Sequence, residues 1–131
     1  LARSGDPQKH LACIHIAGTN GKGSVAAFLD AIFRAAGYRV GKFTSPHLID
    51  ITERFQINGE PIEEDAFREQ VEWFRGLAAT MDPSPTFFEM NTVIAFRWFA
   101  LGKVDVALME VGMGGRFDAT NVLEHPVLSA I

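Results

Sequence analysis

The sequence lacks several features that mark particular classes of protein. It has a single cysteine, Cys13, so no internal disulfide can form, which fits a reducing cytoplasm. No apolar run is long enough to cross a bilayer, and no segment is repeated or low in complexity. Basic residues are scattered over a chain with a net charge of -4, without the basic patch that nucleic acid requires. We therefore expect a cytoplasmic monomer that binds neither nucleic acid nor membrane.

Familiar catalytic and GTP-binding motifs are missing too. No Ser–His–Asp or Cys–His set is apparent, and the guanine-specificity motif Asn-Lys-x-Asp does not occur. What remains is the composition of one globular domain, because 47% of the 131 residues are hydrophobic and 21% are charged. The chain opens on Leu1 rather than methionine, and residues 127–131 resemble a strand stopped partway. We therefore interpret the chain as a fragment.

Apolar runs and helical periodicities alternate along the chain. Strands that alternate with helices predict an α/β fold of P-loop type, with three layers and a mostly parallel sheet that helices cover on both faces. The predicted elements are a strand over 12–17, a helix over 24–36, a strand over 38–43, a long loop with an edge hairpin over 44–62, helices over 63–79 and 87–101, and a strand over 104–111.

A glycine-rich segment joins the first predicted strand to the first predicted helix. Glycines let the backbone turn several N–H groups toward one point, and the helix start adds positive potential. Lys22 adds a full charge for the β- and γ-phosphates of a nucleotide. We interpret the segment as an ATP-binding turn; the alternative is a glycine-rich turn with a solvent-facing lysine. Its residues are Gly18, Thr19, Asn20, Gly21, Lys22, Gly23 and Ser24.

This turn departs from the common P-loop pattern in two places. Ile16 stands where that pattern has its first glycine, and Gly23 stands where it has the hydroxyl residue that binds Mg²⁺. Another oxygen must therefore bind the ion. Ser24 is turned roughly 100° around the helix from Gly23. Thr44 and Ser45 follow the second strand, at the edge of a parallel sheet where ligands gather, and Ser45 is our candidate Mg²⁺ ligand.

The last predicted strand ends on a carboxylate. Glu110 follows mostly apolar residues and would face the nucleotide if its strand neighbours the first one. One or two carboxylates, phosphate oxygens and water commonly hold Mg²⁺, so Glu110 is a second candidate ligand. The alternative is a carboxylate that caps the backbone N–H of Gly112. Asp118 follows the same glycine-rich turn and is suited either to binding a substrate or to closing a turn.

Three further side chains allow more than one interpretation. Glu89, the only acid of the apolar helix 87–101, either stabilises the helix start or contacts a polar heterocycle. His47 follows Pro46 in the loop, and it either hydrogen-bonds a phosphate or positions the loop. His15 alternates with apolar residues within a strand, which indicates a packed histidine rather than a ligand.

Several ungapped motifs occur together and in a fixed order at residues 15–24, 44–48, 53–54, 58–62, 88–89 and 110–121. In these motifs the chain resembles the folylpolyglutamate synthase/dihydrofolate synthase family, within the Mur ligase superfamily. The resemblance spans roughly residues 12–131. Gly23 supports it, because peptidoglycan Mur ligases usually place a hydroxyl residue there.

The resemblance implies an enzyme that uses ATP and Mg²⁺ to phosphorylate a carboxylate, from which an amino group then displaces the phosphate. The acid would be dihydropteroate or the γ-carboxylate of a folylglutamate, and the amine would be L-glutamate. Lys22 would stabilise the transferring phosphoryl group, and Ser45 and Glu110 would bind Mg²⁺. Pro46 and His47 would belong to a flexible loop near the site. The implied pterin or folate contacts are Thr86, Phe87, Phe88, Glu89 and Asp118.

The resemblance also implies further functional residues and a further domain beyond Ile131, namely a histidine metal ligand, a modified lysine and a C-terminal glutamate-ligase domain. We therefore expect residues 1–131 to be a truncated ATP-binding domain that binds nucleotide weakly and does not complete ligation alone. Two rival interpretations are another Mur-type ligase and a non-catalytic nucleotide-binding module.

Overall fold

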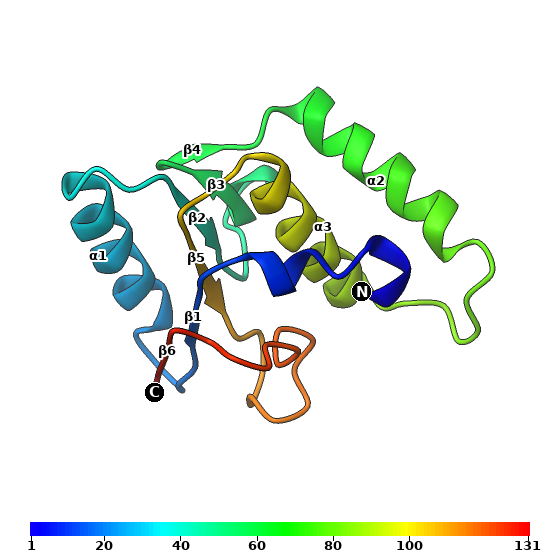
Figure 1. The fold of residues 1–131 in the computed structure, drawn as a ribbon. Coiled ribbons are helices and arrows are strands. Elements are labelled where there is room, and N and C mark those ends of the chain that lie inside the picture. Colours follow the sequence, from blue (N-terminus) through cyan, green and yellow to red (C-terminus); the bar gives the residue numbers. More distant parts are fainter.

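The computed structural model describes all residues, 1–131, and contains the predicted alternation of strands and helices (Figure 1). The strands are β1 (Cys13–Ile16), β2 (Val40–Phe43), β3 (Phe55–Ile57), β4 (Glu60–Pro61), β5 (Val106–Glu110) and β6 (Leu128–Ala130). The α-helices are α1 (Lys22–Ala35), α2 (Glu64–Ala78) and α3 (Phe87–Leu101), and the short 3₁₀ helices are η1 (Ala2–Ser4), η2 (Pro7–His10) and η3 (Ile51–Arg54).

The six strands form one mostly parallel sheet in the order β4-β3-β2-β5-β1-β6. Strands β2, β5, β1 and β6 run parallel, whereas β3 and β4 are antiparallel to their neighbours. Ile16 of β1 is in register with Glu110 of β5, and Phe43 of β2 is in register with Met109. The loops that follow β1, β2 and β5 therefore leave the sheet at the same edge, which is the edge where ligands bind in open α/β sheets.

Helices cover both faces of the sheet, as predicted (Figure 1). Because side chains alternate along a strand, β1, β2 and β5 supply both faces with apolar groups. Helix α1 packs against a small core that includes Ile14, Val40 and Leu108. Helices α2 and α3 pack on the opposite face over a larger core, in which Phe43 and Phe99 are fully buried. No helix combines the length and apolar character needed to span a membrane.

The apolar face predicted for the first helix is partly wrong. Leu29 and Phe33 do pack on the sheet. Val25, Phe28 and Ile32, predicted on the same face, are exposed to 40%, 70% and 62%. The small Ala26 and the charged Asp30 are buried instead, so the inner stripe of α1 is displaced around the helix from the one that hydropathy predicts.

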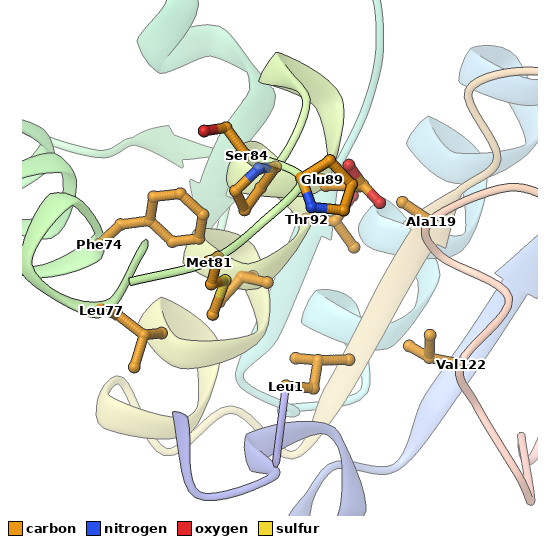
Figure 2. Close-up of a pocket in the computed structure, with 12 residues that line it drawn as sticks. Leu1, Phe74, Leu77, Met81, Ser84, Glu89, Thr92, Ala119 and Val122 are labelled. Carbon is orange, nitrogen blue, oxygen red and sulfur yellow. The ribbon is translucent and has the colours of Figure 1, made fainter. Parts of the chain in front are cut away.

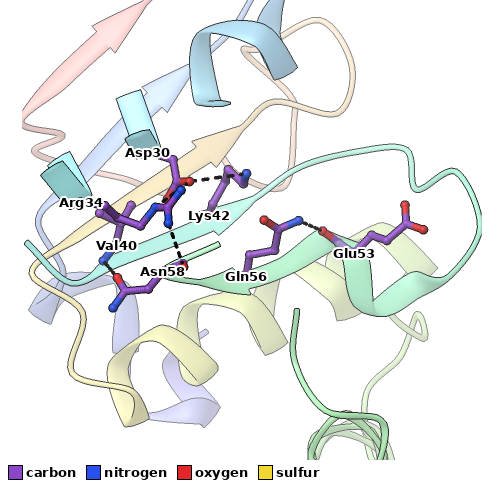
Figure 3. Close-up of polar contacts among 7 residues, drawn as sticks. All are labelled: Asp30, Arg34, Val40, Lys42, Glu53, Gln56 and Asn58. Carbon is purple, nitrogen blue, oxygen red and sulfur yellow. Dashed lines mark hydrogen bonds and ion pairs between the residues drawn. The ribbon is translucent and has the colours of Figure 1, made fainter. Parts of the chain in front are cut away.

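The predicted edge hairpin is present, and polar contacts attach it to the sheet and to α1 (Figure 3). Asn58 and Gly59 form its turn with φ values of 54° and 82°, a pair typical of a two-residue hairpin. The Asn58 side chain accepts a hydrogen bond from Val40 N at 2.8 Å, and the Asn58 carbonyl accepts one from Arg34. Arg34 also pairs with the buried Asp30 at 3.2 Å, so the hairpin, β2 and α1 share one polar network.

Candidate active site

The glycine-rich turn between β1 and α1 has the backbone that glycine permits. Gly18 and Gly21 have φ values of 134° and 79°, where other residues are strained. Helix α1 begins at Lys22, two residues before the predicted start at residue 24, so the lysine lies in its first turn. Lys22 Nζ donates a hydrogen bond back to Gly18 O at 3.0 Å. The lysine therefore folds over the turn rather than pointing to solvent.

Glu110 and Ser45 meet at the edge of the sheet. Ser45 N donates a hydrogen bond to Glu110 Oε2 at 3.1 Å, as the pairing of β2 with β5 allows. The predicted alternative, a cap on Gly112 N, does not occur. Burial raises the pKa of the Glu110 carboxyl, which is 4% exposed, while the Ser45 N–H and the charge of Lys22 act in the opposite direction. The lysine, the carboxylate and the serine are therefore close enough to act on one ligand.

The donor atoms at this edge fit Mg²⁺. Glu110 Oε1 and the Ser45 hydroxyl make no hydrogen bond within the chain, so both oxygens are free to bind an ion. No group of three or more histidine, cysteine or acidic side chains gathers anywhere in the chain. An ion held by Ser45 and Glu110 would therefore take its other ligands from phosphate and water, as Mg²⁺ commonly does.

Asp118 organises the turn that follows β5. Its carboxylate accepts hydrogen bonds from Met113 N at 2.9 Å and from the Thr120 hydroxyl at 2.6 Å. Because the Thr120 hydroxyl donates to Asp118, it accepts from His15 Nε2, at 2.8 Å. Burial lowers the pKa of His15, which is packed in β1 as predicted. Asp118 thus closes a turn, and it also lines the cavity described below.

Glu89 and Thr86 form a capping box at the start of α3. Glu89 Oε2 accepts from Thr86 N and from the Thr86 hydroxyl, each at 2.7 Å, and Glu89 N donates to that hydroxyl. These hydrogen bonds lower the pKa of Glu89. In the same helix turn, the Phe88 ring packs so closely on Gly112 that an added Cβ would lie 2.5 Å from it. Glu89 therefore caps the helix and also contributes to the cavity wall.

Most of the predicted substrate residues lie around one cavity of about 750 Å³. The predicted residues that line it are Lys22, Ser45, Pro46, Thr86, Phe88, Glu89 and Asp118. Phe87, the remaining predicted substrate contact, is 55% exposed and lies outside this lining, as do Glu110 and His47. A smaller, mostly apolar pocket of about 350 Å³ shares Glu89 and Ala119 with the lining of this cavity (Figure 2). In that pocket Phe74, Leu77 and Met81 lie opposite Val122 (Figure 2).

A second large cavity, of about 810 Å³, lies over the glycine-rich turn. Gly18, Thr19 and Lys22 line it together with the glycines after β5 and the end of β6. Lys22, Gly112 and Met113 belong to the walls of both large cavities. The lysine therefore stands at the boundary between a space beside the predicted phosphate site and a space beside the predicted acid site.

Sequence reasoning gave no role to Arg54. This residue is 7% exposed and lines the cavity beside Glu89. Its Nε donates to His47 Nδ1 at 2.9 Å, so His47 contacts the loop that contains it, one of the two predicted alternatives. The available signal was that Arg54 is the only lysine or arginine between residues 44 and 62. Met113 and Phe117, apolar residues on the exposed turn after β5, were also missed as cavity residues.

Comparison with known proteins gives the family. No protein-family model matches the chain. The chain is 44% identical over 136 residues to a dihydrofolate synthase/folylpolyglutamate synthase of Bacillus subtilis (strain 168), a match that covers 100% of this chain and 31% of the relative. The chain belongs to the folylpolyglutamate synthase/dihydrofolate synthase family. It spans 21% to 31% of the length of curated relatives that it matches.

Solved structures of the folylpolyglutamate synthase family share the fold. A Mycobacterium tuberculosis folylpolyglutamate synthase complexed with ADP superimposes with a TM-score of 0.91 at 46% identity, over 95% of this chain and 29% of that one. An FPGS–AMPPCP–folate complex superimposes with a TM-score of 0.93 at 39% identity, over 98% of this chain and 32% of that one. These matches confirm the predicted α/β fold. The matched synthases of Bos taurus and Homo sapiens are described as mitochondrial.

Proposed function

We propose that this chain binds ATP and an acid substrate for an ADP-forming ligase, which joins L-glutamate to dihydropteroate or to the γ-carboxylate of a folylglutamate. The hydrogen bond from Ser45 N to Glu110 Oε2, at the edge from which the Lys22 turn also leaves, carries the proposal. The names of the family's relatives and the nucleotides bound to solved members support it.

The proposed ATP site is the turn of residues 18–24. Its glycines and the N-terminus of α1 would direct backbone N–H groups at the phosphates. Lys22, which reaches back over the turn to Gly18, would exchange that carbonyl for a phosphate oxygen. Its charge then stabilises the transferring phosphoryl group. Gly23 leaves the position after Lys22 without a hydroxyl, so an oxygen of the loop after β2 would serve instead.

Ser45 and Glu110 are the proposed Mg²⁺ ligands. The buried Glu110 is held by one backbone N–H, and a nearby cation would lower the cost of its charge. Bound Mg²⁺ would neutralise charge on the phosphate oxygens. The acid would occupy the cavity beside Glu89 and Asp118, on the other side of Lys22. We further propose that residues 1–131 belong to the ATP-binding domain and that L-glutamate is bound by residues outside them.

The first test is nucleotide binding measured by calorimetry on the 131-residue chain. Charge-assisted hydrogen bonds contribute about 1.5–3 kcal/mol, so Lys22→Ala should weaken MgATP binding by roughly 10- to 100-fold. Its thermal unfolding should be unchanged, because Lys22 bonds only a loop carbonyl. Lys9→Ala, which removes an exposed lysine of η2, is the matched control. Unchanged affinity in Lys22→Ala would show that the lysine is structural.

A second arm tests the metal. Glu110→Gln keeps an acceptor for Ser45 N but removes the charge. Wild-type affinity for ATP should rise when Mg²⁺ is added, and this rise should be lost in Glu110→Gln. In the complete enzyme, Lys22→Ala should abolish ATP-dependent amide formation from dihydropteroate and glutamate. An equal response to Mg²⁺ in Glu110→Gln would remove Glu110 from the proposed ligand set.

A further inference from the structure

Arg54 is a buried cation without a counter-ion. It is the only lysine or arginine among the buried residues, at 7% exposure, and it makes no ion pair with any carboxylate of the chain. Burial lowers the pKa of its guanidinium, and no acidic group opposes that effect. Burying an unpaired charge is costly, so such groups are retained where an anion completes the site.

The acids nearest in sequence and around the cavity are already bound to other donors. Glu53 accepts from the backbone N–H groups of Leu48, Ile49 and Asp50. Glu89 accepts from Thr86, and Asp118 accepts from Met113 and Thr120. Each of these carboxylates therefore stabilises a helix start or a turn and leaves the guanidinium of Arg54 unpaired.

Two neighbours hold Arg54 in place. Its Nε donates to His47 Nδ1, and its guanidinium carbon lies 5.6 Å from the centre of the Phe87 ring, within the range of a cation–π contact. The two terminal nitrogens donate no hydrogen bond within the chain, and neither is sealed from solvent. Because Arg54 lines the cavity, these nitrogens are available to a ligand there.

The position of Arg54 indicates which anion it meets. Arg54 lines the cavity that contains Thr86, Glu89 and Asp118, but it does not line the cavity over the glycine-rich turn. Lys22 is the basic residue that belongs to both. An oxyanion beside Arg54 therefore lies on the acid side of Lys22. A planar guanidinium whose two terminal NH2 groups are free matches a carboxylate in a bidentate pair.

We propose that Arg54 binds the carboxylate of the acid substrate and holds it toward the phosphoryl group at Lys22. This proposal rests on the proposed function and adds the residue that recognises the reacting group. Arg54 is then a substrate-binding residue, and His47 and Phe87 orient its guanidinium.

The experiment compares pteroate with its carboxamide, a neutral analogue of the same shape. Affinities of both are measured by calorimetry on the 131-residue chain saturated with Mg²⁺ and AMPPCP, and the affinity of AMPPCP is measured separately. In Arg54→Met, pteroate should bind at least 10-fold more weakly while the carboxamide changes less than 2-fold, so the preference for the acid disappears. AMPPCP should bind as it does to wild type.

Arg54→Lys keeps the charge but loses the planar fork, and it should retain only part of the preference. This variant also decides the matter if Arg54→Met does not fold. Equal losses of pteroate and carboxamide in either variant would overturn the proposal, because Arg54 would then only shape the cavity. Weaker AMPPCP binding with unchanged pteroate binding would also overturn it and would make Arg54 a phosphate ligand. Failure of the proposed function would be seen separately, as a nucleotide affinity that does not change in Lys22→Ala.

Discussion

Gly41 in the central strand β2 lies directly beneath the ring of Phe99, and adding one methyl group there tests the core that supports the site. A Cβ built on Gly41 lies 2.7 Å from two atoms of the ring and 3.1 Å from a third. Ordinary van der Waals contact begins near 3.4 Å, so the ring would have to move by about 0.7 Å. Phe99 is fully buried among other core side chains, so it cannot swing into solvent.

The expected cost follows from two opposing effects. Overpacking a close-packed core costs about 1–3 kcal/mol, whereas replacing glycine within a strand recovers about 0.5–1 kcal/mol of backbone entropy. Gly41→Ala should therefore lower the free energy of unfolding by about 1–2 kcal/mol. At roughly 2.1 cal/mol/K of unfolding entropy per residue, this is a decrease of about 4–7 °C in Tm.

Urea and thermal unfolding followed by circular dichroism would measure the change. Phe99→Leu alone should also destabilise the fold, because it leaves space in the core. In the double variant the new methyl group occupies part of that space. The loss of unfolding free energy in the double variant should therefore be at least about 0.5 kcal/mol smaller than the sum of the two single losses. Strict additivity, or a Gly41→Ala protein as stable as wild type, would refute the claim that the ring and the strand backbone are in contact.

Two further predictions concern polar groups. His15 is buried and its pKa is lowered, so the stability that its neutral form provides is present above the pKa of the unfolded histidine and lost as pH falls through that value. His15→Gln should therefore lose less stability than wild type between pH 7 and pH 5, measured by urea unfolding. Parallel stability profiles of the two proteins would contradict this. Thr86→Ala should lower the free energy of unfolding by about 1 kcal/mol because α3 loses its capping box, whereas Thr80→Ala, outside any helix, should cost less.

The sequence predicted the elements and the edge of the sheet that carries the site, for identifiable reasons. Helix α3 is found at its predicted bounds because Thr86 and Glu89 form a capping box and a run of apolar residues lies between two breaks. The proximity of Ser45 to Glu110 followed from a single topological rule, because parallel strands place their carboxyl ends at one edge. The turn at Asn58 and Gly59 followed from backbone conformations that few other residues adopt.

The sequence did not predict features that depend on which neighbours a surface has. Hydropathy placed Phe28 and Ile32 on the inner face of α1, but apolar character alone does not say which side of a helix meets the sheet. Arg54 lies against Phe87, which is distant along the chain and stands at the start of α3, so this contact could not be predicted from the sequence. The position of Glu89 also required the structure. The sequence offered helix capping and a place in the binding site as alternatives, whereas the side chain both caps α3 and lines the cavity.

The β4 margin of the sheet limits how the molecule can associate. Strand β4 has only two residues and includes Pro61, which has no N–H to offer a neighbouring strand. Pairing of another strand with β4 is therefore disfavoured, so association through backbone hydrogen bonds does not begin at this margin.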